Sequence, residues 1–135
     1  MKSIFDAHGQ LEIFLEGRIL IVRGTDSPNI EMVDEFNLRV EEFYQLLEGA
    51  PWGSLTYLFG DVLFPPDAVT MIESNFRRMI SLGLCGIAVV ISDTQYPMLV
   101  RDFWVSIYEK VGISYQFFED PEDAKSWLLS KINAG

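Results

Sequence analysis

The chain has few of the residues that most catalytic and metal sites require. Among its 135 residues there is one cysteine, Cys85, and one histidine, His8. A lone cysteine forms no internal disulfide, and Cys85 lies in the apolar stretch 84–91, where a thiol behaves as a small hydrophobic group. His8 lies in the polar segment 6–10, so we expect it at the surface rather than beside a nucleophile.

Basic residues are also scarce. Ten lysines and arginines stand against 20 aspartates and glutamates, which gives a formal net charge of −10. Such a chain repels phosphate backbones and anionic lipid surfaces, so we expect no binding to nucleic acid. The negative charge either keeps an apolar chain in solution or forms an acidic docking face for a partner.

Long apolar runs are absent as well. No stretch approaches the roughly 20 apolar residues that cross a bilayer, and the first residues lack the apolar segment of a secretion signal. We therefore expect no membrane span and a location in the cytoplasm. There is no repeat, low-complexity tract or linker, so residues 1–135 are expected to form one domain.

Apolar residues, by contrast, are abundant at 49% of the chain, enough to build a core. They fall into segments of alternating type. Period-two and continuous apolar runs predict strands at 11–15, 18–23, 52–59, 86–91 and 115–118, the first two joined by a hairpin at Glu16 and Gly17. Three- and four-residue spacing predicts helices at 30–48, from Pro66 to about 82, at 96–111 and after the cap residue Asp120.

The resulting order is ββαβαβαβα, which defines the fold class as α/β. Right-handed crossovers between the later strands make the sheet mostly parallel, with one antiparallel strand at its edge. We thus predict a five-stranded sheet with helices packed on it.

Acidic residues follow three of the predicted strands. Asp26, Asp61 and Asp93 each come just after a strand, where the carboxyl ends of parallel strands gather ligands. Carboxylates placed together there would suit Mg²⁺ or Ca²⁺. The alternative is that aspartate is simply a favoured turn and cap residue.

Other catalytic signatures are missing from the sequence. The segment 23–27 holds one glycine and matches neither the Walker nor the dinucleotide pattern. We assign no catalytic residue and no cofactor, and we expect no enzyme activity.

Two apolar features favour binding. The connector 61–66 carries three large apolar residues beside two prolines, and it either joins the core or forms a stiff hydrophobic projection. The helix at 96–111 is apolar around most of its circumference, so part of it is expected to face another helix, a ligand or another chain. The candidate partner-binding residues are Phe64, Pro65, Pro66, Asp67, Tyr96, Phe103 and Trp104.

The chain resembles the SpoIIAA-like group, which belongs with the STAS and CRAL-TRIO lipid-binding folds. The resemblance extends over nearly the whole chain and depends on four segments: 19–24, 51–53, 82–91 and 111–124. It implies an alternating β/α fold that binds proteins or small apolar ligands, and it implies no enzyme activity.

At one position the chain departs from the STAS pattern. The antagonists of that family resemble one another most at a segment that opens a helix with a phosphorylated serine, and here the matching segment, 64–69, has no serine. Asp67 would instead place a fixed negative charge at the helix start, or act as its cap.

Three functions follow as hypotheses. The first is a non-enzymatic interaction or regulatory module that binds a protein partner or itself. The second is a carrier of a hydrophobic, lipid-like molecule in a pocket between the sheet and the helix at 96–111. The third is a metal-dependent hydrolase or phosphotransferase built on Asp26, Asp61 and Asp93.

Overall fold

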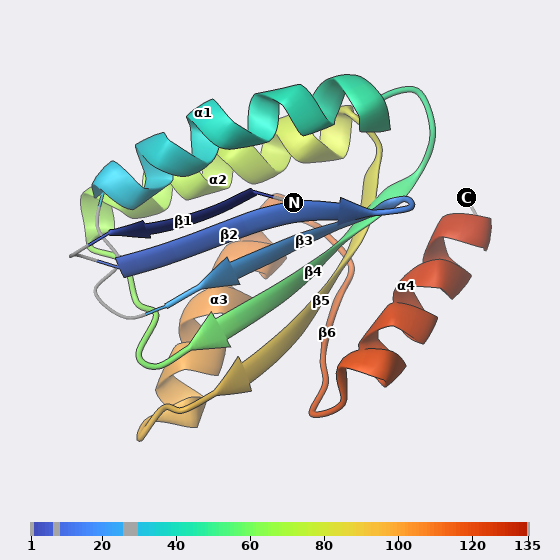
Figure 1. The fold of residues 1–135 in the computed structure, drawn as a ribbon. Coiled ribbons are helices and arrows are strands. Elements are labelled where there is room, and N and C mark those ends of the chain that lie inside the picture. The colour runs from blue at the N-terminus through green and yellow to red at the C-terminus, as the bar shows by residue number, and fades with distance from the viewer. Residues whose placement is uncertain (1, 7–8, 26–29, 135) are drawn as a thin grey trace.

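The computed structural model describes residues 2–6, 9–25 and 30–134, with the backbone alone for residues 2–6, 9 and 10. Its strands are β1 (Lys2–Asp6), β2 (Gly9–Glu16), β3 (Ile19–Gly24), β4 (Trp52–Phe59), β5 (Leu84–Ser92) and β6 (Tyr115–Phe117). Its helices are α1 (Ile30–Leu47), α2 (Pro66–Ser81), α3 (Pro97–Val111) and α4 (Pro121–Ala134) (Figure 1).

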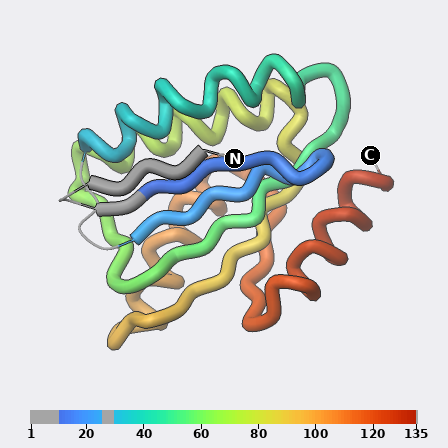
Figure 2. The backbone as a smooth tube through the Cα atoms, in the orientation of Figure 1, coloured from blue at the N-terminus to red at the C-terminus, as the bar shows by residue number. Residues whose placement is uncertain are grey.

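The strands form one mixed sheet in the order β1-β2-β3-β4-β5-β6 (Figure 2). The pairs β1/β2 and β2/β3 are antiparallel, and the remaining pairs are parallel. The α/β class is confirmed, and from Gly9 onward the elements follow the predicted order. The sheet has one strand more than the five predicted, because β1 pairs with β2 from Lys2↔Ile13 to Asp6↔Gly9.

Helices α1, α2 and α3 cover one face of the sheet. They connect β3, β4, β5 and β6, which are successive neighbours, and right-handed crossovers in one direction all fall on the same face. Their buried side chains share one core with the strands, including Val40 of α1, Ile72 of α2 and Trp104 of α3. Most of the apolar core therefore lies between the sheet and these three helices.

Helix α4 packs on the opposite face, apart from the other helices (Figure 1). Ala124 and Leu128 of α4 are fully buried against Leu55 of β4 and Ala88 of β5. Gly53 allows this close approach, since a Cβ atom at that position would lie 2.8 Å from Leu128 Cδ2. A side chain at position 53 would therefore force Leu128 out of its present position.

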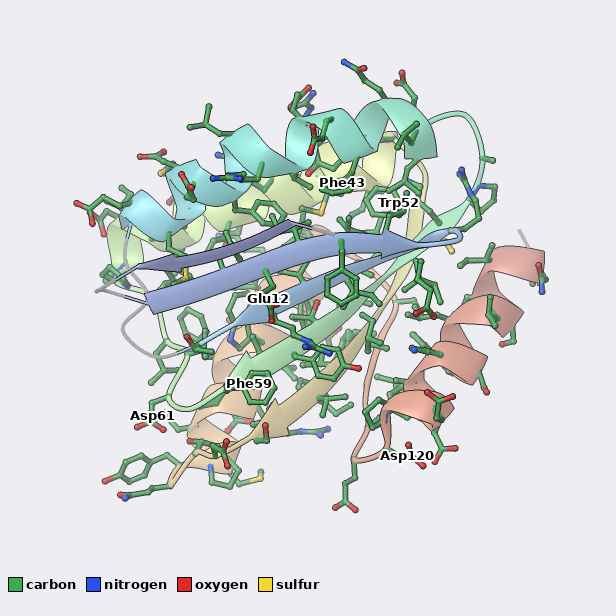
Figure 3. The ribbon with its side chains drawn as sticks, in the orientation of Figure 1. Glu12, Phe43, Trp52, Phe59, Asp61 and Asp120 are labelled. Atoms are coloured by element: carbon green, nitrogen blue, oxygen red, sulfur yellow. The ribbon has the colours of Figure 1, made fainter. Side chains whose placement is uncertain are left out.

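A part of this second face carries aromatic side chains around an arginine. The Arg23 guanidinium lies 4.9 Å from the centroid of the Tyr57 ring and 5.5 Å from that of Phe14. Arg23 Nη1 is also 3.5 Å from Glu12 Oε1. Glu12 and Phe59 are labelled on this face in Figure 3.

Candidate functional site

A cavity of about 110 Å³ lies between the sheet and the layer of α1, α2 and α3. Strands β2, β3 and β4 line it on one side, the three helices line it on the other, and the connector after β4 lines its edge. The lining residues are Leu11, Leu20, Val22, Gly24, Met32, Val33, Phe36, Ser54, Thr56, Leu58, Val62, Phe64, Ile72, Asn75, Phe76, Met79, Trp104 and Tyr108. The surface of the cavity is almost wholly apolar.

Trp104 fixes the edge of the cavity where α3 meets the connector. Its indole Nε1 donates a hydrogen bond to the carbonyl oxygen of Val62 at 2.9 Å. The ring of Phe64 meets the indole edge to face, with centroids 5.9 Å apart. These contacts hold the connector over the cavity, so its apolar residues face inward.

Tyr108, one helical turn after Trp104, places its ring in the cavity lining. The residue is fully buried, and its ring centroid lies 5.6 Å from that of Phe76 and 5.4 Å from that of Tyr115. Its hydroxyl has no hydrogen-bond partner within the described part of the chain. Burial raises the pKa of this phenol well above its ordinary value of 10.0, so the group stays neutral.

Strand β4 contributes two hydroxyl groups to an otherwise apolar surface. Ser54 and Thr56 alternate with Leu55, so both side chains point toward the helices. Ser54 Oγ and Thr56 Oγ1 lie 3.3 Å apart and hydrogen bond to each other. Because a buried hydroxyl without a partner is unfavourable, this pairing makes two polar residues tolerable in the strand.

No charged residue occurs among the described residues of the lining. The 18 of them include no aspartate, glutamate, lysine, arginine or histidine. Besides the two hydroxyls of β4 and that of Tyr108, the described lining has the amide of Asn75 and the indole N–H of Trp104, which already donates to Val62. The site is therefore suited to an uncharged molecule.

The candidate partner-binding residues lie in two separate regions. Phe64 and Trp104 line the cavity, and Phe103 packs edge to face on Trp104 with centroids 5.3 Å apart. Pro65, Pro66 and Asp67 are exposed at the start of α2, and Tyr96 is exposed before α3. The sequence left open whether the connector 61–66 joins the core or projects outward. In the structure its apolar part is packed inside and its prolines face outward.

Two of the three aspartates considered for a metal, Asp61 and Asp93, lie among the residues that the structure describes. Asp61 and Asp93 are both exposed, and Thr94 Oγ1 donates a hydrogen bond to Asp61 Oδ1 at 2.5 Å (Figure 3 labels Asp61). Asp26 lies outside the residues that the structure describes, as does His8. Within the described ranges no three acidic, histidine or cysteine side chains are grouped to hold a metal ion.

Cys85 is half-buried rather than deeply buried, and burial raises the pKa of its thiol. A raised pKa favours the neutral thiol, which is the less reactive form. Among the described helices none is both long and apolar enough to cross a membrane.

Sequence reasoning did not single out the polar residues of the cavity. Ser54, Thr56, Asn75 and Tyr108 were not among the candidate site residues. Hydroxyls at two alternate positions of an apolar strand were the available signal, because both must face the same side of the sheet. Such alternating hydroxyls do not distinguish a strand that borders a cavity from one that lies in a fully packed core.

Comparison with known proteins gives no relative to set beside this geometry. No family model, no curated protein and no solved structure matches the chain. The resemblance to the SpoIIAA-like group accordingly stays a prediction.

Proposed function

We propose that this protein binds a small hydrophobic molecule in the cavity between the sheet and helices α1–α3, without transforming it. The observation that carries the proposal is the cavity itself, with its almost wholly apolar surface. An apolar cavity of about 150 Å³ in another protein takes up benzene, so about 110 Å³ is on the scale of a small ring. Filling it would restore the contacts that the lining side chains lack.

The chemistry of the lining supports binding over catalysis. Hydroxyl groups become nucleophiles when a base lies beside them, and the lining residues that the structure describes include no histidine, carboxylate or amine. The resemblance to SpoIIAA-like and CRAL-TRIO folds is consistent with a binding role, and membership of that group is part of this proposal. A small apolar ligand falls within the sequence hypothesis of a carrier for a hydrophobic small molecule.

A variant that fills the cavity tests the proposal. Val22 lies in the lining and is half-buried, so Val22→Phe places a ring into the cavity. We expect toluene to raise the melting temperature of the unchanged protein in a concentration-dependent way, because a ligand that binds only the native state stabilises it. The rise should disappear in Val22→Phe.

The matched control is Val105→Phe, at a half-buried position of α3 that does not line the cavity. It should keep the response to toluene. An equal response in Val22→Phe and Val105→Phe, or no response in the unchanged protein, would contradict ligand binding in this cavity.

A second candidate function is self-association through the start of α3, in line with the interaction module suggested by the sequence. Three large apolar side chains cluster there with high exposure: Tyr96 at 56%, Met98 at 65% and Leu99 at 55%. Exposed apolar clusters of this kind often mark protein contacts.

Sedimentation velocity tests the second candidate. We expect the unchanged protein to form dimers and the variant Met98→Glu/Leu99→Glu to sediment as a folded monomer, as judged by a cooperative unfolding transition. A monomer before and after substitution at high protein concentration would remove this function.

A further inference from the structure

The polar groups in the cavity lining and their placement indicate which ligand the cavity selects. The inference in this subsection rests on the proposed function, and it adds the chemical class of the molecule. Three features carry it: the size of the cavity, the absence of charge among its lining residues, and the paired hydroxyls of Ser54 and Thr56.

Charge is the first criterion. An ionised carboxylate or ammonium moved into an apolar site loses its hydration, and it needs an opposite charge or several hydrogen-bond donors to compensate. The described residues of the lining offer no charged side chain. A fatty acid with its carboxylate inside the cavity would therefore be rejected, and so would an amine.

Hydrogen bonding is the second criterion. Two hydroxyl groups carry two hydrogens, and the bond between Ser54 Oγ and Thr56 Oγ1 uses one of them. The hydroxyl that accepts this bond keeps its own hydrogen, and a ligand oxygen beside β4 can accept it. Ser54 is 5% exposed, so water competes little for the position.

We propose that the cavity selects neutral, ring-sized molecules that carry one hydrogen-bond acceptor, such as an aryl ketone, aldehyde or ester, and that the Ser54 and Thr56 hydroxyls bind this acceptor. The apolar remainder of the ligand lies against the aromatic side chains of the helices. Specificity comes from the hydroxyl pair, while the apolar lining supplies most of the affinity.

Three probes of nearly equal size separate these contributions. Acetophenone carries one carbonyl oxygen, α-methylstyrene replaces that oxygen by a methylene group, and benzoate carries a full negative charge. Dissociation constants for the three are measured by isothermal titration calorimetry at pH 7 with the unchanged protein and with Ser54→Ala/Thr56→Val. Both substitutions remove a hydroxyl with little change in side-chain size.

We expect acetophenone to bind the unchanged protein about fivefold more tightly than α-methylstyrene, and benzoate not to bind. In Ser54→Ala/Thr56→Val, acetophenone should lose about tenfold in affinity, because its carbonyl, held beside β4, then lacks the donor on that strand. The affinity for α-methylstyrene should stay within about twofold, which also shows that the variant is folded. The single variant Thr56→Val should also lower the affinity for acetophenone.

The matched control is Thr70→Val/Ser74→Ala, which removes two exposed hydroxyls of α2 and should leave all three affinities unchanged. In Ser54→Ala/Thr56→Val, the affinities for acetophenone and α-methylstyrene could fall by the same factor, or the preference for acetophenone could stay unchanged. Either result would overturn the selection by hydroxyls and leave ligand binding itself intact. Binding of benzoate as tight as that of acetophenone would overturn the criterion of neutrality. Failure of both neutral probes to bind the unchanged protein would instead remove the proposed function itself.

Discussion

At the scale of single residues, two buried aromatic side chains of α3 differ in whether their polar atoms are hydrogen bonded. Trp104 and Tyr108 are both buried on α3, one turn apart. The indole N–H of Trp104 donates a hydrogen bond to the carbonyl oxygen of Val62, whereas the hydroxyl of Tyr108 has no partner within the described residues. A buried hydroxyl of this kind lowers stability because it has lost its hydrogen bonds to water.

Tyr108→Phe should therefore raise the free energy of unfolding, by about 1 kcal/mol, since it removes only the unpaired hydroxyl. Urea denaturation measures the change. Tyr96→Phe is the control, because Tyr96 is exposed and its hydroxyl meets water in both states. A clear loss of stability in Tyr108→Phe would show that its hydroxyl is paired after all.

Gly83 gives a second residue-scale prediction. Its φ is +113°, and a Cβ atom there would lie 2.7 Å from the carbonyl oxygen of Ala50. Gly49 has a φ of +96° but open space where a Cβ atom would be. Gly83→Ala should be less stable than Gly49→Ala by about 2 kcal/mol, because only the former adds a clash with backbone to the strained conformation. Similar melting temperatures for the two variants would contradict this packing.

At the scale of elements, the end of α1 is held by an arginine from another part of the chain. Helix α1 has no basic residue in its last turn. Arg18, from the turn between β2 and β3, donates instead to the carbonyl oxygens there, at 2.5 Å to Leu47, 2.7 Å to Ala50, 3.1 Å to Pro51 and 3.3 Å to Leu46. One guanidinium thus binds the free carbonyls of the helix end and complements its dipole.

Arg18→Met should lower the free energy of unfolding by about 2 kcal/mol, because several carbonyls lose a charged donor together. Hydrogen exchange should show faster opening of the last turn of α1 in particular. Arg77→Met, at an exposed position of α2, is the control and should change little. If both variants were equally stable, the Arg18 contacts would contribute nothing to holding the helix.

Helices α1 and α2 are joined by an ion pair that responds to pH. Arg78 donates to both carboxylate oxygens of Glu41, at 2.8 and 2.5 Å, and these hydrogen bonds hold the pKa of Glu41 below its ordinary value of 4.5. A carboxylate whose pKa is lower in the folded state stabilises the fold above its unfolded pKa, and this effect is lost as the pH falls through the folded pKa.

The stability difference between the unchanged protein and Glu41→Gln should accordingly be largest near pH 7 and shrink as the pH falls below 4.5. Urea denaturation over a pH series measures it. In an Arg78→Met background the same substitution should show a much weaker dependence on pH, because the donor is gone. A difference that grows on acidification would contradict the direction of the shift.

At the scale of the whole molecule, local sequence signals were enough to order the elements but not to place every strand. Asp120 and Pro121 marked the start of α4, which begins at Pro121, and the apolar run 86–91 lies inside β5. Strand β1 was missed because residues 2–6 show no clear alternation of apolar and polar residues. Its strand conformation depends on pairing with β2, which is information from the folded chain.

The candidate site was less predictable than the fold, for a physical reason. The sequence indicated a pocket between the sheet and the aromatic helix as one alternative, and Phe64 and Trp104 do line the cavity. A cavity, however, is the space that remains after the side chains of three strands, three helices and a connector have packed. No local sequence pattern encodes that space. The hydroxyls of Ser54 and Thr56 can be recognised as part of a binding site only once the cavity beside them is known.

The most direct test of the central claim is a methyl NMR titration of the unchanged protein with toluene. We predict saturable shifts of the methyl groups that line the cavity, those of Leu20, Val33 and Ile72 among them, while the methyl groups of Leu128 in α4 stay unchanged. Shifts confined to exposed methyl groups such as those of Leu38 and Leu46, or no saturable shift at all, would contradict the binding of a hydrophobic ligand between the sheet and helices α1–α3.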